Sequence, residues 1–159
     1  MKILVFSDSH GKSKYIDEAL KIHGGVCDLV VFLGDGLSDI EYIKDKYPNL
    51  TFFAVKGNCD FFTGNYPSYS VLDLDGIKVL ITHGHLFGAK SGYERLVYLA
   101  LEKEADAVFF GHTHMPIDEI VECNDKQVHL FNPGSIGYGG TYGVVNTSGR
   151  VLVCSYGKI

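Results

Sequence analysis

The sequence predicts an α/β (α+β) protein in which two β-sheets pack as a sandwich with helices outside. Three observations favour this fold. Short apolar runs alternate with helical patterns through the first two thirds of the chain, only strand patterns follow, and several apolar runs end next to Asp, His or Asn. One long mixed sheet is the alternative.

The composition is that of an ordinary globular domain. The chain has 159 residues, of which 46% are hydrophobic and 21% charged, so we expect a single domain over 1–159 with a sizeable core. The net charge of −5 and the presence of only two arginines give no basic surface, which makes nucleic acid an unlikely partner.

The cysteines and the apolar runs bear on location. Cys27, Cys59, Cys123 and Cys154 are widely spaced and contain no CxxC pair, which is typical of free thiols in a reducing compartment. The sequence shows no signal-peptide pattern, and no apolar run approaches the roughly 20 residues of a membrane span. We therefore expect a cytoplasmic protein without a membrane partner.

The first third of the chain alternates strands and helices. Continuous apolar runs, typical of strands buried on both faces, predict strands at Lys2–Phe6, Asp28–Leu33 and Thr51–Val55. Between them, a stripe of Ile16, Ala19 and Leu20 predicts a helix from an N-cap at Ser13 to about His23. A second helix is predicted over Ser38–Lys46, before Tyr47-Pro48.

The rest of the chain begins with an aromatic loop at 61–69, followed by a hairpin of 71–74 and 77–82 that turns at Asp75-Gly76. Ser91 and Glu94 form the pattern of a capping box, which predicts a helix to about Lys103 with Leu96, Leu99 and Ala100 inward. After a strand at Ala107–Phe110, an antiparallel meander is predicted from Ile117–Glu122, Val128–Phe131, Tyr142–Asn146 and Arg150–Ser155.

Five apolar runs end in residues that bind metals. They read VFSDSH, FLGDG, VKGNCD, ITHGH and FFGHTH, and four of them contain a glycine beside the ligand-type residue. If these strands are neighbours, their carboxyl ends meet at one rim of the sheet, where α/β proteins bind ligands. One such ending is unremarkable, because Asp and Asn form turns and histidines are often solvated, but five together favour a metal centre.

The metal-ligand candidates are imidazoles, carboxylates and one amide: Asp8, His10, Asp35, Asn58, His83, His112 and His114. Seven side chains exceed the four ligands of one tetrahedral zinc. The mixed donor set therefore predicts two divalent metal ions, with manganese favoured and nickel, iron or zinc as alternatives.

The motifs D-x-H, G-D, G-N-x-D, T-H-G-H and G-H-T-H, in this order from Asp8 to His114 and followed by Asn132-Pro133-Gly134-Ser135, resemble the calcineurin-like metallophosphoesterase superfamily. The resemblance is greatest to its small single-domain phosphodiesterases from bacteria and archaea. It implies a two-sheet sandwich flanked by helices. It also implies that Asp8, His10 and His114 hold one metal, that Asn58, His83 and His112 hold the other, and that Asp35 bridges them.

One position departs from the family pattern. Many members carry a histidine for leaving-group protonation where this chain has Cys59, whose thiol is a weaker donor and near two cations loses its proton. The general acid therefore stays unassigned, with His85 as a candidate for it or for a hydrogen-bonded role outside the ligand set. The candidate catalytic residues are Asp35, Asn58, Cys59, Asp60 and His85.

These observations predict a dinuclear metal-dependent phosphodiesterase that acts on small substrates, with phosphomonoesters as a second substrate class. In this hypothesis a hydroxide that bridges the two ions attacks phosphorus in line. The alternatives are a non-catalytic protein-binding scaffold, as in the retromer small subunit, and a nuclease. The aromatic residues of 61–69 (Phe61, Phe62, Tyr66 and Tyr69) line a substrate pocket or, more in keeping with exposed aromatics, form a homo-oligomer contact.

Overall fold

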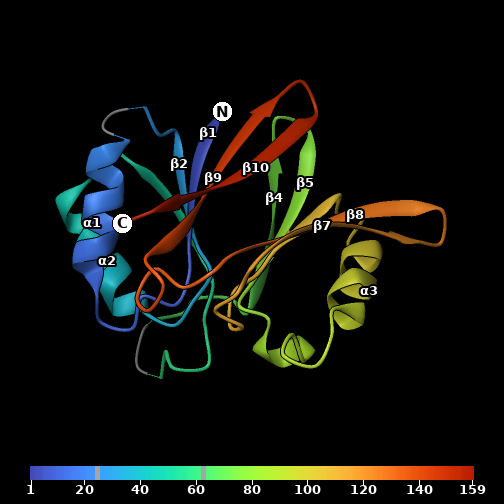
Figure 1. The fold of residues 1–159 in the computed structure, drawn as a ribbon, viewed down its shortest axis with the longest axis horizontal. Helices are drawn as coiled ribbons and strands as arrows, with labels where there is room; N and C mark the ends of the chain where they lie inside the picture. Colours follow the sequence, from blue (N-terminus) through green and yellow to red (C-terminus); the bar gives the residue numbers. More distant parts are fainter. Residues whose placement is uncertain (24–25, 62–63) are drawn as a thin grey trace.

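The structure, a computed structural model, describes residues 1–23, 26–61 and 64–159, in which two five-stranded sheets pack face to face (Figure 1). The strand order of the first sheet is β10 (Val151–Lys158), β9 (Thr141–Ser148), β1 (Lys2–Phe6), β2 (Leu29–Phe32) and β3 (Thr51–Ala54). That of the second is β4 (Tyr69–Leu74), β5 (Ile77–Thr82), β6 (Ala107–Phe109), β8 (Lys126–Pro133) and β7 (Pro116–Cys123). The predicted sandwich is confirmed, and the alternative of one mixed sheet is wrong.

Helices cover the outer faces of both sheets. Figure 1 shows α1 (Ser13–Ile22) and α2 (Leu37–Lys46) on the first sheet and α3 (Glu94–Glu102) on the second. The central strand β1 is buried on both faces, because Ile3 and Val5 pack between the sheets while Leu4 and Phe6 pack under the helices. Each such buried side chain contributes about 1.5–3 kcal/mol to stability. This packing fixes the directions in which the ends of β1 and β2 point.

The predicted antiparallel meander is wrong in its connectivity. β7 and β8 do form an antiparallel hairpin, but β8 runs parallel to β6, with Phe109 opposite Phe131. After Pro133 the chain crosses to the other sheet, where β9 pairs antiparallel with β1 and β10 with β9. Asn132 and Pro133 are the last residues of β8, opposite Ile117 and Pro116 of β7, and Gly134, with a φ of +78°, begins the crossing segment.

Both predicted helix caps are also wrong. The N-cap of α1 is Lys12, so that Ser13 is already helical, and the N-cap of α3 is Tyr93, with Glu94 as its first residue. Ser91 instead donates its backbone N–H to Gly88 in the preceding turn. α3 buries Leu96, Val97 and Ala100, whereas the predicted inward Leu99 is half-buried.

The hairpin between β4 and β5 turns as predicted, with left-handed φ values of +56° at Asp75 and +82° at Gly76. β4 begins at Tyr69, so that residue belongs to a strand rather than to the predicted loop. The helices of the described ranges are all too short or too polar to cross a bilayer.

Candidate metal centre

The ends of five strands from both sheets meet at one rim, as the sequence predicts. Asp8 and His10 follow β1, Asp35 follows β2, Asn58 follows β3, His83 follows β5, and His112 and His114 follow β6. The parallel pairs β1–β2, β2–β3 and β5–β6 place these ends on the same side of each sheet. We call this region the strand-end rim.

The backbone at the strand-end rim is strained. Five of the predicted ligands lie in the left-handed region, with φ of +55° at Asp8, +46° at His10, +60° at Asp35, +66° at His112 and +60° at His114. This conformation costs non-glycine residues on the order of 1–3 kcal/mol each and clusters at functional sites. These left-handed residues turn the backbone sharply after each strand, so that the side chains point toward a common region at the rim.

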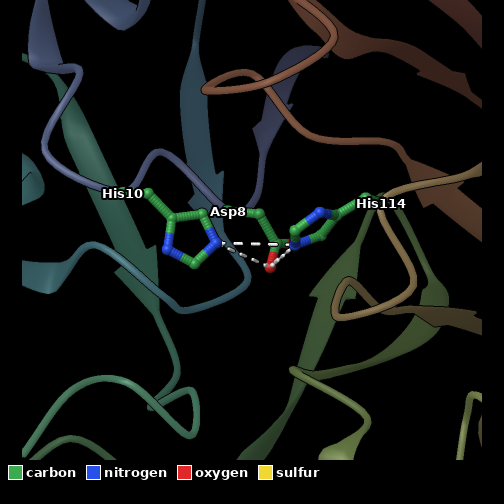
Figure 2. Close-up of side chains that lie close together, drawn as sticks. All are labelled: Asp8, His10 and His114. Carbon is green, nitrogen blue, oxygen red and sulfur yellow. Dashed lines mark hydrogen bonds and ion pairs between the residues drawn. The ribbon is translucent and has the colours of Figure 1, made fainter.

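The first group of donors is Asp8, His10 and His114, which we call the outer half of the rim. Figure 2 shows the three side chains turned toward one another. Asp8 Oδ1 lies 3.1 Å from His114 Nε2 and 3.7 Å from His10 Nε2, and the two nitrogens are 3.4 Å apart. The other oxygen of Asp8 accepts hydrogen bonds from the Ser7 hydroxyl at 2.5 Å and from the His112 N–H at 3.0 Å. One carboxylate oxygen therefore holds the loop while the other faces the histidines.

The second group, Asn58, His83 and His112, forms the inner half of the rim. His83 is fully buried, and its Nδ1–H donates to the Leu33 carbonyl at 2.7 Å, because a carbonyl can only accept. Its Nε2 then faces Asn58 Oδ1 at 3.1 Å and Asp35 Oδ2 at 3.4 Å. Burial opposes the charged ring, but the contacts with Asp35 and Asp8 raise the pKa of His83, so Nε2 carries a proton toward these oxygens when no metal is bound. A divalent ion can take the place of that proton, and a second ring nitrogen that donates to a carbonyl is the arrangement that metal-binding histidines adopt.

Asp35 lies between the two halves. Its Oδ1 accepts the Cys59 N–H at 2.7 Å, whereas Oδ2 lies 3.4 Å from His83 Nε2 and 4.0 Å from His10 Nε2. Burial alone would raise the pKa of Asp35, but the contact with His83 holds it well below its ordinary value. Asp35 is therefore an ionised carboxylate with one oxygen directed at both groups of donors.

Among the inner-half donors, His112 makes the loosest contact with the others. Its ring lies edge-on to His83 at a centroid distance of 5.1 Å, and it is half-buried. Burial, followed by the charge of His83, lowers the pKa of His112 to about 4. The ring is thus neutral at physiological pH, as a metal ligand must be.

Cys59 and Asp60 differ in what their side chains do. Asp60 is buried, and its two oxygens accept the backbone N–H groups of Asp35, Gly36, Leu37 and Gly57, so it positions the loops after β2 and β3. Cys59 is exposed, and its sulfur accepts a hydrogen bond from Asn58 Nδ2 at 3.2 Å. Desolvation and the Asp35 carboxylate raise the pKa of Cys59 to about 11, so the thiol is protonated at neutral pH when no metal ion lies near it.

His85 lies behind the inner half, with its ring 5.3 Å from that of His83. Burial and the neighbouring His83 lower its pKa, which favours the neutral ring over a protonated general acid. Its Nδ1 is buried and finds no hydrogen-bond partner within the described ranges. The acid role of His85 stays a prediction.

Two further parts of the sequence brace the rim. A Cβ at Gly111 would lie 1.9 Å from Ser7 Oγ, so only glycine allows the turn before His112 to pack against the β1 loop. Asn132 is buried, and its Nδ2 donates to the Gly111 carbonyl at 2.9 Å and to Thr113 Oγ1 at 3.1 Å. Ser135 donates to the Asp8 carbonyl at 2.8 Å. These contacts explain why the Asn132-Pro133-Gly134-Ser135 motif accompanies the ligands.

Lys12 and Tyr138 were not identified from the sequence. The exposed Tyr138 ring stacks on His114 at 5.3 Å and lies 5.1 Å from His10. Lys12 Nζ lies 4.9 Å from the centre of the Tyr138 ring and donates to the Gly137 carbonyl at 2.6 Å. Lys12 follows the D-x-H motif by two residues, which is the only sequence signal that could have indicated it.

The aromatic segment 61–69 is divided between different surroundings. Phe61 is 74% exposed, whereas the Tyr66 hydroxyl is hydrogen-bonded to Lys44 and Glu41 on α2. Phe62 lies outside the described residues. Because Tyr66 is engaged within the chain, Phe61 and Tyr69, which is 38% exposed, are the described aromatic side chains of this segment that reach the surface, and the homo-oligomer stays a prediction.

The rim as a whole fits divalent metal ions. Its donors are imidazole nitrogens, carboxylate oxygens and an amide oxygen, which together suit manganese, iron, nickel or zinc. Two overlapping sets, Asp8–His10–His114 and Asp8–Asp35–His83, each place their ligand atoms within 4.8 Å of one another. The donor set and its place at the carboxyl ends of strands in a two-sheet sandwich fit a metal-dependent hydrolase.

Comparison with known proteins gives the family. The family model described as the calcineurin-like phosphoesterase superfamily domain matches residues 1–150, and the chain belongs to this superfamily. The probable metallophosphoesterase YsnB of Bacillus subtilis is 37% identical over 137 residues, which cover 86% of this chain and 75% of YsnB. The phosphodiesterase YfcE of Escherichia coli K12 is 28% identical over 160 residues, covering 86% of this chain and 79% of YfcE.

Solved structures agree with this assignment. A predicted phosphoesterase from Streptococcus pneumoniae superposes with a TM-score of 0.79 at 30% identity, covering 99% of this chain and 88% of that one. Vps29 of Entamoeba histolytica in complex with zinc shares the fold, with a TM-score of 0.74 at 19% identity over 99% of both chains.

Proposed function

We propose that the protein hydrolyses small phosphodiesters with two divalent metal ions held side by side at the strand-end rim. The observation that carries this proposal is the position of Asp35, whose Oδ2 faces His83 of the inner half and His10 of the outer half. Asp8, His10 and His114 hold one ion, Asn58, His83 and His112 hold the other, and Asp35 serves both. We expect manganese in this mixed set of imidazole nitrogens and carboxylate and amide oxygens, with nickel, iron or zinc as alternatives.

The chain's own groups orient this centre. Ser7 and the His112 N–H fix one oxygen of Asp8, and the Cys59 N–H fixes one oxygen of Asp35. When bound, two neighbouring ions supply a water nucleophile of lowered pKa and neutralise charge that develops at phosphorus. The protein residues thus position the donors, and the bulk of the electrostatic stabilisation comes from the ions.

The rim favours diesters over monoesters. A monoester carries up to one more negative charge than a diester. The positive side chains near the rim are lysines, Lys12 beside Tyr138, Lys90 near His112 and Lys56 near His85, whereas the two arginines lie on α3 and in the turn before β10. The exposed Tyr138 ring next to His10 and His114 offers a flat apolar face for an aromatic leaving group. The similarity to the phosphodiesterase YfcE supports the same substrate class.

The test is turnover of bis-p-nitrophenyl phosphate and p-nitrophenyl phosphate by metal-free protein to which manganese or nickel is added. We expect metal-dependent hydrolysis with a higher kcat/KM for the diester, and its loss in His112→Ala. Equal rates for wild type and His112→Ala, or no turnover with any divalent metal, would refute the proposal.

A protein-binding scaffold is the second candidate, because Vps29 shares the fold. Since a Vps29 has been crystallised with zinc, metal content alone does not separate the two functions, whereas turnover does. The nuclease alternative is tested with the same protein on single-stranded and duplex oligonucleotides, for which the charge of −5 predicts weak or no cleavage.

A further inference from the structure

A second group of metal-ligand side chains lies away from the strand-end rim. Asp118 on β7, His129 on β8 and Cys154 on β10 place a carboxylate oxygen, a ring nitrogen and a thiol sulfur within 4.8 Å of one another. His129 is in register with Ala107, the first residue of β6, whereas the rim follows the last residue of that strand. The group is therefore displaced toward the opposite end of the sheet.

The three donors come from both sheets. β7 is an edge strand of the second sheet and β10 is an edge strand of the first. Cys154 packs against the apolar core between the sheets, while the side chain of Asp118 is 37% exposed. The group thus spans the open edge of the sandwich and connects its interior to solvent.

We propose that Asp118, His129 and Cys154 form a zinc site that joins the edges of the two sheets. Thiolate, imidazole and carboxylate are the three ligand types that proteins offer to zinc, and three protein ligands leave a fourth position for water. Zinc-bound donors lie about 3–4 Å from one another, as follows from bond lengths of about 2.0–2.3 Å, so modest side-chain shifts bring these donors onto one ion. The softer sulfur donor distinguishes this site from the nitrogen and oxygen donors of the rim.

The surroundings of the thiol support this assignment. His129 Nε2 and Asp118 Oδ1 are 2.5 Å apart, a contact that accounts for two of the three side chains but not for a free thiol beside them. Burial and the Asp118 carboxylate raise the pKa of Cys154 to about 12, so that the thiol is protonated when no cation is present. Zinc reverses this balance by binding the thiolate, and the thiol proton is released to solvent.

The site is also accessible. The His129 side chain is 17% exposed, and a cavity bounded by Ile77, Asp106, His129, Arg150 and Leu152 opens beside it. Solvent therefore reaches His129 through this cavity, and it reaches Asp118 directly, since that side chain is 37% exposed.

Cobalt titration tests the site, because a thiolate bound to Co²⁺ gives a charge-transfer absorption that oxygen and nitrogen ligands do not give. The titration uses the Cys59→Ser protein, since Cys59 lies near His10 and Asp35 at the rim. We expect the band to appear in Cys59→Ser and to be abolished when Cys154→Ser is added. Zinc should displace the cobalt and remove the band.

Cys27 supplies the matched control, because it is another half-buried thiol whose pKa burial raises, but its sulfur is hydrogen-bonded to the Leu29 carbonyl at 3.1 Å. Cys27→Ser in the same background should retain the band. Asp118→Asn, which preserves shape at an exposed position, should weaken cobalt binding at least tenfold with an unchanged circular dichroism spectrum. A band that survives Cys154→Ser, or that never forms in Cys59→Ser, overturns the proposal.

Discussion

The two halves of the strand-end rim hold their donors in different ways. In the outer half, Asp8 is buried but His114 is exposed, and the two histidines contact the Asp8 carboxylate, each other and the Tyr138 ring. In the inner half, His83 is fully buried and the orientation of its ring is fixed by the hydrogen bond from Nδ1 to the Leu33 carbonyl. The outer half is thus assembled by contacts among its donors and with Tyr138, whereas the inner half is centred on a buried histidine held by a directional hydrogen bond.

This difference indicates how the chain keeps several carboxylates and histidines close together at the rim. Asp8 and Asp35 are two neighbouring carboxylates, and the His83 ring nitrogen faces both of them. The buried His83 provides a rigid centre, and the exposed side of the rim stays open to ions and substrate. We therefore expect changes in the outer half to affect metal occupancy, and changes in the inner half to affect both occupancy and stability.

The largest effect is expected from removing the carboxylate that the halves share. Asp35→Ala should lower kcat/KM for bis-p-nitrophenyl phosphate by about 10³-fold or more, because two-metal stabilisation is worth several kcal/mol and each 1.36 kcal/mol is about tenfold. Metal analysis should show that both ions are lost or weakened.

The control for Asp35→Ala is Asp45→Ala, an exposed carboxylate on α2 that should leave activity and metal content unchanged. Retention of one tightly bound ion by Asp35→Ala, with activity within tenfold of wild type, would show that Asp35 belongs to one half only.

The next effect separates the halves directly. His114→Ala should lose the outer ion and His112→Ala the inner ion, each with about a 10²-fold loss of activity, comparable to the upper range for removing groups that support metal ligands. Calorimetric titration of each variant with manganese should find one remaining site. If both variants lose the same ion, the two histidines form a single chelate and the division into halves is wrong.

The parts of the site that follow from local sequence could be predicted. Asp8, Asp35 and His83 stand directly beyond apolar runs, and the parallel pairing of those runs brings their carboxyl ends to one rim whatever the loops do. Lys12 and Tyr138 could not be predicted in this way, because their contact joins segments 126 positions apart through the crossing after β8.

The prediction of the connectivity of the last third of the chain was wrong for the same reason. The residue pattern of β7, β8, β9 and β10 indicates strands but does not indicate which sheet each joins, because that depends on packing between distant faces. The grouping of Asp118, His129 and Cys154 is a consequence of the sheet change after Pro133 and was hidden from any reading of consecutive residues.

A smaller effect is expected at Cys59, where the inner half meets solvent. Its sulfur accepts the hydrogen bond that turns the Asn58 amide so that Oδ1 faces His83. Cys59→Ala should therefore weaken the inner ion by about tenfold, the lower range for such supporting groups, and Cys59→Ser, which keeps an acceptor, should recover most of it. A 10²-fold or larger fall in kcat for both variants at saturating metal would instead identify the thiol as the general acid.

The smallest effect on function is expected from a carboxylate that belongs to neither half. Asp17 joins α1 to α2 through Lys46 and the Tyr47 hydroxyl, both at 2.7 Å, and Lys21 at 2.7 Å completes the cluster. Its hydrogen bonds with Lys21 and Lys46 hold the pKa of Asp17 well below its ordinary value.

A carboxyl whose pKa is lower in the folded state contributes stability that is fully present above the unfolded pKa of about 4 and is lost as the pH falls toward the folded pKa. Asp17→Asn should thus cost about 1 kcal/mol of unfolding free energy near neutral pH, less as the pH drops below about 4, with kcat/KM and metal content unchanged. Urea titrations at several pH values measure this, and a fall in metal content would mean that the helix layer, and not only the strand ends, holds the rim in place.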